Sequence, residues 1–409
     1  MQHLLPAARR LLQPVRSAGR LLRTASTRAG NQLAGPRFAA RLARRGPAPT
    51  GAVAVFFSGG PENLYQFEQW RRPLEELAAG RPVVVVVERP DTGEAILRSS
   101  SLPVVFARGS RALEELVTGR GVTVVLYLDQ LEANFRMLRF AAPVHVQIGH
   151  GESDKVSSVS NQHKAYDLVL VGGPAGSDRL QAALRGFDAA SRTLQVGRPQ
   201  LDHSYPGAPD WPRGSGRRVW YAPTWEGDRP SLAYGSLATH GVALVEALVA
   251  EDDVRVLYRP HPRTGMASPV HRAADRRIRA LLRSAGDRHL VDLGPYGWQW
   301  AFADACVTDV SAVAYDWLAT GKPLVVTEPA ATAFRPPSPL LDRLPLLPAA
   351  QAGQVMRVLE GRGLDGSGAD AGLEDLVRYY FGVTADRAST ARFLAAVETC
   401  CALAASTGG

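Results

Sequence analysis

The chain has 409 residues, of which 45% are hydrophobic and 21% are charged. This composition is that of a globular protein with a large core, and it excludes a disordered or coiled-coil chain. The length favours two or three domains, and the net charge of +8 raises the question of an anionic partner.

The positive charge is concentrated in the first 48 residues. No acidic residue precedes Glu62, whereas ten arginines do: Arg9, Arg10, Arg16, Arg20, Arg23, Arg28, Arg37, Arg41, Arg44 and Arg45. Without these ten, 37 basic and 39 acidic side chains give the rest of the chain a net charge of −2. A nearly neutral body argues against an extended nucleic-acid-binding groove, so we expect no nucleic-acid partner.

Within this basic N-terminal arm, residues 1–48, the stretch 4–22 has the pattern of an amphipathic helix. At about 100° per residue its apolar side chains share one stripe and four arginines lie opposite. Such a helix suits the surface of an anionic membrane, although Pro14 would kink it. A disordered Arg/Ala-rich leader and a mitochondrial transit peptide are the alternatives.

Cysteine usage and apolar runs bear on the compartment. Cys306, Cys400 and Cys401 cannot form a disulfide framework, which favours a reducing cytosol. We expect no apolar run of the roughly 18–20 residues that span a bilayer. The sequence therefore predicts a cytoplasmic protein, peripheral on the inner face of the cell membrane through its arm.

From residue 52 the chain alternates short apolar runs with helical patterns. Strands are predicted at 52–57, 83–87, 104–106, 122–127, 144–148 and 168–171, and helices near 63–78, 110–118 and 132–139. Continuous apolar strands separated by helices are typical of a parallel sheet covered on both faces. Residues 49–205 therefore predict a doubly wound, Rossmann-like α/β domain.

The segment 205–218 is rich in Pro and Gly and predicts a linker. The same alternation then restarts, with strands expected at 219–222, 254–258, 290–293, 306–308 and 324–327. Residues 218–386 therefore predict a second Rossmann-like domain, and residues 387–409 a C-terminal helix that packs on either half. Two such domains facing a cleft bind ligands at the carboxyl ends of their strands.

His150 lies between two glycines where a predicted strand ends, in VQIGHGESDK. Flanking glycines let the backbone approach a substrate closely, and a neutral imidazole at that point can take a proton from an attacking hydroxyl. The alternative is a turn histidine that only bonds nearby backbone.

A second histidine, His261, follows another predicted strand in VLYRPHPRTG. The two prolines around it fix the backbone, which favours recognition, and Arg259 or His261 can donate to a phosphate oxygen. The alternative is a surface turn with structural prolines.

A third motif, TDVSAVAYDWLATGKP, runs from a strand into a helix. The strand ends at Asp309, Ser311 occupies the expected N-cap, and Asp316 follows within the helix. Unsatisfied N–H groups at a helix start form an anion site that suits a diphosphate. The alternative is an ordinary capped helix with Asp316 exposed.

In this order the motifs resemble those of the CDP-glycerol glycerophosphotransferase family, the teichoic-acid primases and polymerases. The resemblance runs from about residue 150 to 392 and rests on the HG pair with Lys155, Tyr166-Asp167, Gly197-Arg198-Pro199 with Asp202, YAPTW, RPHP and TDVSAVAYDWLATGKP. It implies a GT-B arrangement of two Rossmann-like domains, with the less similar residues 52–140 serving a variable acceptor.

The resemblance also implies roles for single residues. His150 corresponds to the catalytic base and His261 to the histidine that contacts the donor phosphates. Ser311 and Asp316 match the Ser-Ser-x-x-x-Asp pattern of the donor site, in which Ala312 replaces the second serine. The missing hydroxyl removes a possible hydrogen bond of about 1 kcal/mol.

The expected reaction is attack of an acceptor hydroxyl, deprotonated by His150, on the β-phosphorus of CDP-glycerol or a related CDP-polyol. CMP leaves, and Arg259, His261, Ser311 and the helix start after Asp309 neutralise the diphosphate. The acceptor is expected to be lipid-linked or polymeric, in the cell envelope. No cofactor is expected, and no metal-ligand spacing stands out in the sequence.

Two other readings remain open at this stage. A GT-B glycosyltransferase that uses a nucleotide sugar shares the fold and the phosphate site, and Ala312 keeps this reading open. A non-catalytic, membrane-bound scaffold could retain the same fold without the activity.

Overall fold

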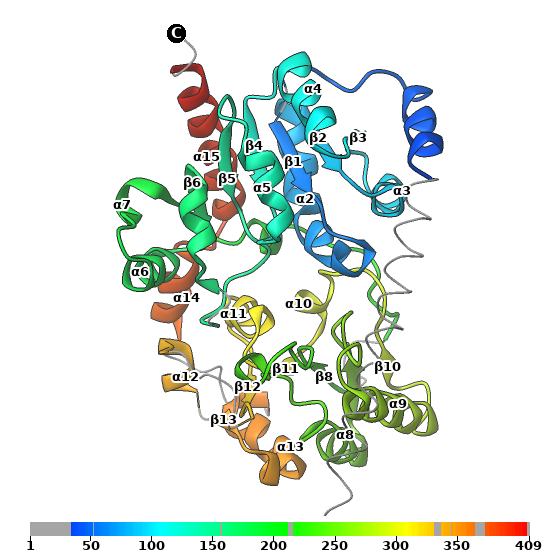
Figure 1. Ribbon diagram of the computed structural model, residues 1–409. Helices are drawn as coiled ribbons and strands as arrows, with labels where there is room; N and C mark the ends of the chain where they lie inside the picture. The colour runs from blue at the N-terminus through cyan, green and yellow to red at the C-terminus, as the bar shows by residue number, and fades with distance from the viewer. Residues whose placement is uncertain are drawn as a thin grey trace, which may run out of the picture.

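The computed structural model describes residues 34–51, 53–155, 158–211, 216–330, 337–344, 346–364 and 373–406. Within them the chain forms two α/β halves, which lie one above the other in Figure 1. Each half is built on one sheet, and every strand pair in both sheets is parallel. The predicted fold class, two Rossmann-like doubly wound domains, is confirmed.

The first half contains a seven-stranded sheet of order β3-β2-β1-β4-β5-β6-β7. Its strands are β1 (Val53–Phe57), β2 (Val83–Val87), β3 (Val104–Phe106), β4 (Val124–Tyr127), β5 (Val144–Gln147), β6 (Leu168–Val171) and β7 (Thr193–Gln195). The helices are α2 (Leu64–Gly80), α3 (Pro90–Ser99), α4 (Ser110–Arg120), α5 (Phe135–Leu138), α6 (Pro174–Ala183) and α7 (Ala189–Arg192). The strand order reverses between β1 and β4, the point at which doubly wound sheets bind ligands.

The second half contains a six-stranded sheet of order β10-β9-β8-β11-β12-β13. Its strands are β8 (Arg217–Ala222), β9 (Val254–Tyr258), β10 (Leu290–Val291), β11 (Ala305–Thr308), β12 (Leu324–Thr327) and β13 (Leu346–Leu347). The helices are α8 (Gly241–Ala250), α9 (Pro269–Ser284), α10 (Gln299–Phe302), α11 (Ala312–Leu318), α12 (Pro339–Arg343) and α13 (Val355–Leu359). Here the order reverses between β8 and β11.

The predicted strands are present, and two short ones were not predicted. β7 and β13 are edge strands of three and two residues and carry too few apolar residues to give a periodic signal. The strand expected at 290–293 ends at Val291. Its continuation is shortened because Asp292 turns inward to bond Arg259 and Gln299.

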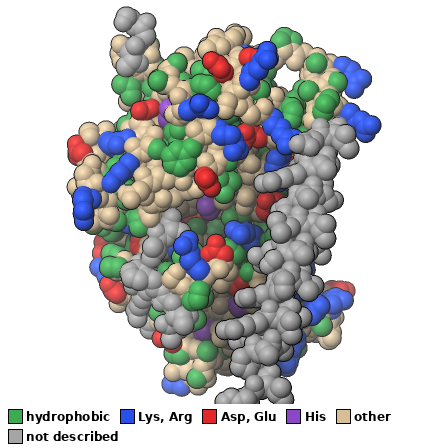
Figure 2. Space-filling model, in the orientation of Figure 1, with side chains coloured by type: hydrophobic (Ala, Val, Ile, Leu, Met, Phe, Trp, Pro, Cys, Tyr) green, Lys and Arg blue, Asp and Glu red, His purple; other side chains and the backbone are tan. Residues whose placement is uncertain are grey.

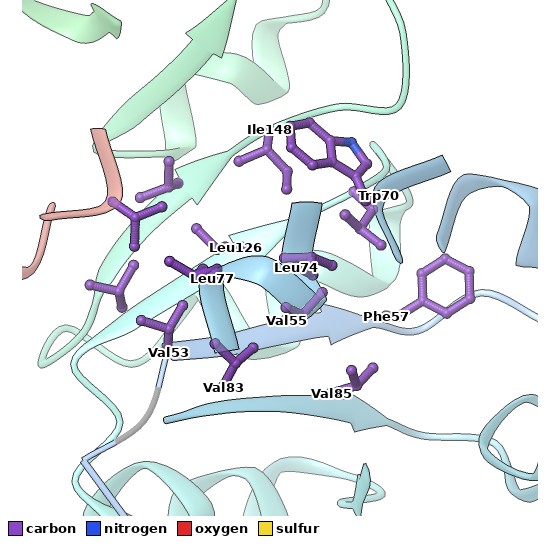
Figure 3. Packing of buried hydrophobic residues seen from close by; sticks show 14 of the residues in the cluster. Val53, Val55, Phe57, Trp70, Leu74, Leu77, Val83, Val85, Leu126 and Ile148 are labelled. Atoms are coloured by element: carbon purple, nitrogen blue, oxygen red, sulfur yellow. The ribbon is translucent and has the colours of Figure 1, made fainter. Parts of the chain in front are cut away.

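The core of the first half shows why these segments fold as they do. Alternate residues of β1, Val53, Val55 and Phe57, face α2, whose apolar side chains recur every three or four residues on one face (Figure 3). These α2 side chains, Phe67, Trp70, Leu74 and Leu77, are all 3% exposed or less. A stripe with this spacing is what an amphipathic helix buries on a sheet.

The C-terminal segment returns from the second half to the first. Helix α14 (Glu374–Phe381) packs on α6, and α15 (Ala388–Ser406) packs beside β4 and β5 (Figure 1). Phe393, Val397 and Cys400 of α15 belong to the core of the first half. The C-terminal helix, which the sequence allowed on either half, thus covers the first sheet.

Helix α15 is also long and apolar enough to cross a membrane by length and composition. The expectation that no segment would reach that length was therefore wrong for residues 388–406. The helix combines small, weakly polar residues with leucine and phenylalanine, so its mean hydropathy is high although no single run is strongly apolar. In this structure it packs one face on the first half.

Part of the basic arm is packed on the first half. Residues 34–43 are helical, Phe38 is 3% exposed and stacks edge-on with Phe106 at 5.7 Å between ring centroids, and Arg41 pairs with Glu94. The amphipathic helix expected at 4–22 lies outside the described residues. On the face shown in Figure 2, basic and acidic side chains are interspersed over both halves.

Candidate active site

A cavity of about 800 Å³ lies between the two halves. Its wall includes His150, which follows β5, together with Arg259 and His261, which follow β9, and Ser311, which follows β11. Four of the six predicted site residues therefore share one cavity. Asp309 and Asp316 do not line it.

The turn that carries His150 is fixed from several sides. Gly149 has φ of +59°, a conformation that favours glycine, and its carbonyl accepts a hydrogen bond from the Trp70 indole of α2. The carbonyl of His150 accepts from Arg198 at 2.9 Å. The ring bonds the carbonyl of Leu128, so one ring nitrogen donates and the other is left as an acceptor when the ring is neutral.

His261 uses a ring nitrogen as an acceptor, whereas His150 uses its ring N–H as a donor. The Nδ1 of His261 accepts the backbone N–H of Arg263 at 3.1 Å, so the neutral ring carries its proton on Nε2. The loop that follows is held by Glu226, whose carboxylate accepts the N–H groups of Gly265, Ala267 and Ser268 at 2.8–2.9 Å. His261 is thus a rigidly placed donor.

Tyr65, in the first turn of α2, lies against both histidines. Its ring meets the His150 ring edge-on with centroids 5.8 Å apart and the His261 ring at 5.1 Å. The two histidines come from opposite halves, so Tyr65 marks where they face each other. Sequence reasoning missed this residue, because one tyrosine at a helix start is no signal before the second half is docked.

Both histidines are held in the neutral form. Burial lowers the pKa of His150 to about 4, helped by the positive charges of Arg198 and Lys155. Burial lowers the pKa of His261 to about 3, helped by Lys155 and Arg263. A neutral His150 can accept a proton at physiological pH, and a bound dianion would make protonation of either ring easier.

Cationic side chains surround the histidines. Burial lowers the pKa of Lys155 to about 8, opposed by Asp309, and the ammonium lies 5.0 Å from the centre of the Tyr234 ring. The Arg263 guanidinium lies 3.8 Å from the centre of the Trp225 ring. Arg259 donates to Asp292 at 2.6 Å and to the Gly294 carbonyl at 3.1 Å, so part of its charge is already paired.

Asp309 organises the second half from behind the cavity. Its fully buried carboxylate accepts the backbone N–H of Thr224 at 2.6 Å, that of Ser236 at 3.2 Å and the hydroxyl of Thr327 at 2.5 Å. Burial raises its pKa above the usual range. These contacts fix the YAPTW loop at the carboxyl end of β8, and the Asp309 carboxylate itself does not line the cavity.

Ser311 precedes α11 at the N-cap position, as predicted, but its side chain makes no capping hydrogen bond. Its hydroxyl lies 3.3 Å from that of Thr308, and both Ser311 and Ala312 line the cavity. The hydroxyl is thus left close to the cavity, where a ligand oxygen can reach it.

Asp316 joins the two halves. Its carboxylate accepts two bonds from Arg198, from Nε at 2.8 Å and from Nη2 at 2.9 Å, and both side chains are 5% exposed or less. Asp316 is therefore not the exposed charge of the alternative interpretation, because its side chain is buried, and it does not line the cavity. The same Arg198 holds the His150 carbonyl, so Asp316 is connected to the site through Arg198.

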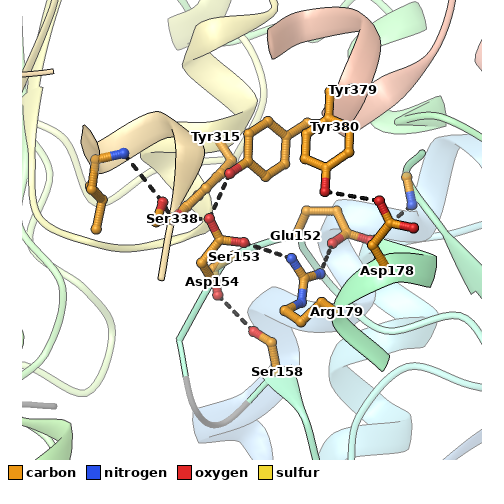
Figure 4. Close-up of polar contacts among 12 residues, drawn as sticks. Glu152, Ser153, Asp154, Ser158, Asp178, Arg179, Tyr315, Ser338, Tyr379 and Tyr380 are labelled. Atoms are coloured by element: carbon orange, nitrogen blue, oxygen red, sulfur yellow. Dashed lines mark hydrogen bonds and ion pairs between the residues drawn. The ribbon is translucent and has the colours of Figure 1, made fainter. Parts of the chain in front are cut away.

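A second polar network crosses between the halves (Figure 4). Asp154 accepts a bond from Arg179 of α6 at 2.7 Å, from Tyr315 of α11 at 3.2 Å and from Tyr380 of α14 at 2.6 Å. Arg179 also pairs with Glu152. These buried hydrogen bonds and ion pairs fix the segment that follows His150 relative to the second half.

Among the residues that the structure describes, no three His, Cys, Asp or Glu side chains lie together as a candidate metal site. The positive charge that faces the cavity comes instead from the lysine and arginine side chains described above.

Two parallel-sheet domains around a cleft, with histidines from both sides and several cations, define a GT-B-like fold. Residues 137–335 match the family model described as CDP-Glycerol:Poly(glycerophosphate) glycerophosphotransferase, so this part of the chain is similar to that family. The resemblance inferred from the motifs is confirmed. The chain is a CDP-glycerol glycerophosphotransferase-like enzyme.

Solved structures agree on the fold. The wall teichoic acid polymerase TagF aligns with a TM-score of 0.54 at 14% identity, over 87% of this chain and 90% of that one. A histidine variant of TagF soaked with CDPG aligns with a TM-score of 0.55 at 15% identity, with the same coverage of both chains. A UDP-N-acetylglucosamine 2-epimerase from Listeria monocytogenes aligns with a TM-score of 0.58 at 13% identity, over 86% of this chain and 96% of that one. No curated protein sequence matches the chain.

Proposed function

We propose that His150 is the general base of the transfer and that His261 binds the donor diphosphate. The acceptor oxygen attacks the β-phosphorus of CDP-glycerol while its proton passes to the free ring nitrogen of His150. The bond from that phosphorus to the bridging oxygen breaks, and its electron pair leaves with CMP. One P–O bond forms, one breaks, and the proton remains on His150 until product release.

The observation that carries this proposal is the contact of one tyrosine ring with both histidines. Tyr65 touches His150 of the first half and His261 of the second, so the two rings face one reaction space. Their hydrogen bonds give them different roles: His150 keeps an acceptor nitrogen because its donor is used by Leu128, and His261 keeps a donor because Nδ1 is used by Arg263.

The donor diphosphate fits the second half of the cavity. The Nε2–H of His261, the Ser311 hydroxyl and the charges of Arg259 and Arg263 belong to this part of the wall, and Lys155 of the first half adds its charge. Fixed donors and cations aimed at phosphate oxygens supply most of the catalysis in phosphoryl transfer. Asp309 and Asp316 support this set from behind, through the YAPTW loop and Arg198.

We further propose a lipid-linked or polymeric cell-envelope acceptor and a location at the inner face of the cell membrane. The support is the basic, amphipathic pattern of residues 4–22, which suits an anionic bilayer surface. An enzyme held at the bilayer surface would then have its cavity close to the end of a membrane-bound acceptor.

Release of CMP, UMP or GMP from a panel of CDP-polyols and nucleotide sugars tests the function. We expect CMP release from CDP-glycerol that requires an acceptor, and a loss of roughly 10²–10⁴-fold in His150→Ala with donor affinity retained. His261→Ala is expected to weaken donor binding as well. Release of UMP or GMP alone would instead establish a sugar transferase, and an inert donor panel with intact donor binding would indicate a scaffold.

A further inference from the structure

A single guanidinium joins the turn of the proposed base to the opposite half. Arg198 follows β7 in the first half and is 4% exposed. Its Nη2 donates to the His150 carbonyl at 2.9 Å, and its Nε and Nη2 donate to the Asp316 carboxylate at 2.8 and 2.9 Å. Asp316 belongs to α11 of the second half, so the group that orients Arg198 is supplied from across the cleft.

The contact with Asp316 fixes the direction of Arg198 as well as its position. Two parallel N–H···O bonds from one guanidinium to one carboxylate hold the planar group in a single orientation. The carboxylate is itself held in place, because Asp316 is 2% exposed and its neighbours Tyr315 and Trp317 are fully buried. The N–H group that reaches the His150 carbonyl is therefore aimed by α11.

The His150 turn depends on such contacts because its own backbone is permissive. A glycine precedes the histidine and another follows it, and glycine allows conformations that other residues rarely adopt. Trp70 holds the Gly149 carbonyl from within the first half, and Arg198 holds the carbonyl of His150 itself. One of these two restraints therefore ends in the second half.

The helix that holds Arg198 also carries a proposed donor contact. Ser311 precedes α11 and lines the cavity, and Asp316 follows within the helix. A shift of α11 relative to the first half would move the Ser311 hydroxyl and the carboxylate that orients Arg198 together. The donor side of the cavity and the turn of the base are thus connected through one helix.

Resting on the proposed function, we propose that Arg198 is a positioning residue for the base, and that Asp316 makes this positioning depend on the docking of the two halves. His150 takes up its place for proton transfer only when α11 packs against the first half. The same docking brings Ser311 to the donor diphosphate. The base and the donor site are assembled in one step.

Two other roles for Arg198 predict different results. Arg198 also lines the cavity, so the first is a direct bond to a donor phosphate, which predicts weaker donor binding when the arginine is removed. The second is an ion pair that only holds the halves together, which predicts that turnover returns whenever stability returns.

The double variant Arg198→Met/Asp316→Leu separates these roles, because it removes both buried charges at once. For a folded double variant, we expect kcat for CMP release to fall by roughly 10–100-fold, because the His150 carbonyl has lost its donor and the base is displaced. The Kd of CDP-glycerol, measured by calorimetry without acceptor, should stay within about twofold of the wild-type value. Wild-type kcat, or a donor Kd raised in proportion to the loss of turnover, would overturn the proposal.

Two further variants test folding and stability. Asp316→Asn keeps the shape of the side chain but places an N–H₂ group where Arg198 needs an acceptor, so it should lower kcat even if the double variant does not fold. Leu282→Ala is the control, because Leu282 is 2% exposed in the core of the second half and does not line the cavity. It should lower the urea midpoint and leave kcat unchanged. An equal loss of kcat in Leu282→Ala would assign the effect to stability alone and refute the positioning role.

The same double substitution in a His150→Ala background shows whether Arg198 acts through the base. Groups that act as a unit have non-additive effects, so we expect the further loss of kcat in this background to be less than about twofold. A loss as large as in the wild-type background would refute the positioning role alone. Normal CMP release in His150→Ala itself would instead refute the proposed function.

Discussion

A Cβ atom placed on Gly151 would stand 2.6 Å from the Cβ of Ala312. Gly151 follows His150, the proposed base, in the first half, and Ala312 opens α11 in the second. The two halves therefore meet in direct van der Waals contact at the cavity wall, and the missing side chain at 151 is what permits it.

Gly151→Ala is expected to push the His150 turn away from α11. Overpacking of this kind costs about 1–3 kcal/mol, and a displacement of the base by about an ångström lowers turnover roughly 100-fold. Urea unfolding and CMP release measure both effects. Gly119→Ala in α4 is the control, because a Cβ there meets nothing within 4 Å; it should leave turnover unchanged and raise stability by about 0.5–1 kcal/mol. Normal turnover in Gly151→Ala would show that the contact does not position the base.

Ala312→Ser restores the serine that the family pattern has at this position. The Cβ is unchanged, so the contact with Gly151 is kept, and the new hydroxyl lies on the cavity wall beside Ser311. A hydrogen bond of about 1 kcal/mol to the donor corresponds to about fivefold tighter binding of CDP-glycerol, which calorimetry can measure. Unchanged or weaker donor affinity in a folded variant would mean that this hydroxyl does not face the diphosphate.

The buried pair of Arg198 and Asp316 is expected to be a major contributor to domain docking. Removing one partner leaves an unpaired buried charge, so Arg198→Met should lower the free energy of unfolding by about 3–5 kcal/mol. The double variant Arg198→Met/Asp316→Leu should recover much of the loss, because both charges are gone. Urea titrations of Arg198→Met, Asp316→Leu, the double variant and the wild-type enzyme complete the double-mutant cycle. A single variant that loses less than about 1 kcal/mol would show that the pair is not strongly coupled.

Stability is expected to fall in mild acid because of the two cleft histidines. Their pKa values, about 4 for His150 and about 3 for His261, lie below the roughly 6.5 of an unfolded chain. The unfolded state therefore binds more protons between about pH 6.5 and 4. The stability that the two neutral histidines give the folded state is complete above pH 6.5 and declines as the pH falls. Both rings retain some exposure, which limits the effect to about 1–2 kcal/mol per histidine at pH 5.

Urea unfolding at pH 7 and pH 5 measures this difference. The double variant His150→Gln/His261→Gln should show a smaller loss between the two pH values than the wild-type enzyme. Other buried histidines, such as His289, whose pKa is also lowered to about 4, contribute equally to both proteins and cancel in the comparison. Identical losses would assign the acid sensitivity to those other residues.

The proposed membrane role of the arm is tested by a deletion that ends before the helix 34–43. Deleting residues 1–33 removes most of the basic pattern and keeps the helix 34–43, whose Phe38 is buried against Phe106. This deletion should abolish binding to vesicles that contain anionic lipid, while turnover of a soluble acceptor and thermal stability stay unchanged. Vesicle flotation and CMP release are the measurements.

Deleting 1–48 instead should also destabilise the first half, by about 3 kcal/mol or more for the lost phenylalanine packing. Undiminished flotation after removal of 1–33 would refute the arm's role.

Most of the fold can be predicted from local patterns in the sequence. Runs such as the five valines of β2 and the helical stripe of α2 are local patterns, and their repetition on both sides of the Pro/Gly-rich segment 205–218 indicates two doubly wound domains. His150 and His261 could also be predicted as cleft residues, because each follows the carboxyl end of a strand and such positions converge at one edge of a parallel sheet.

The residues that meet across the cleft could not be predicted from these local patterns. Arg198 and Asp316 are 118 positions apart, and Tyr65 joins histidines from opposite halves. Asp316, a donor-site candidate in the sequence, is committed to an ion pair. The physical reason is that periodicity records whether a side chain is buried, whereas its partner depends on how two separately folded halves, and the returning helix α15, pack against each other.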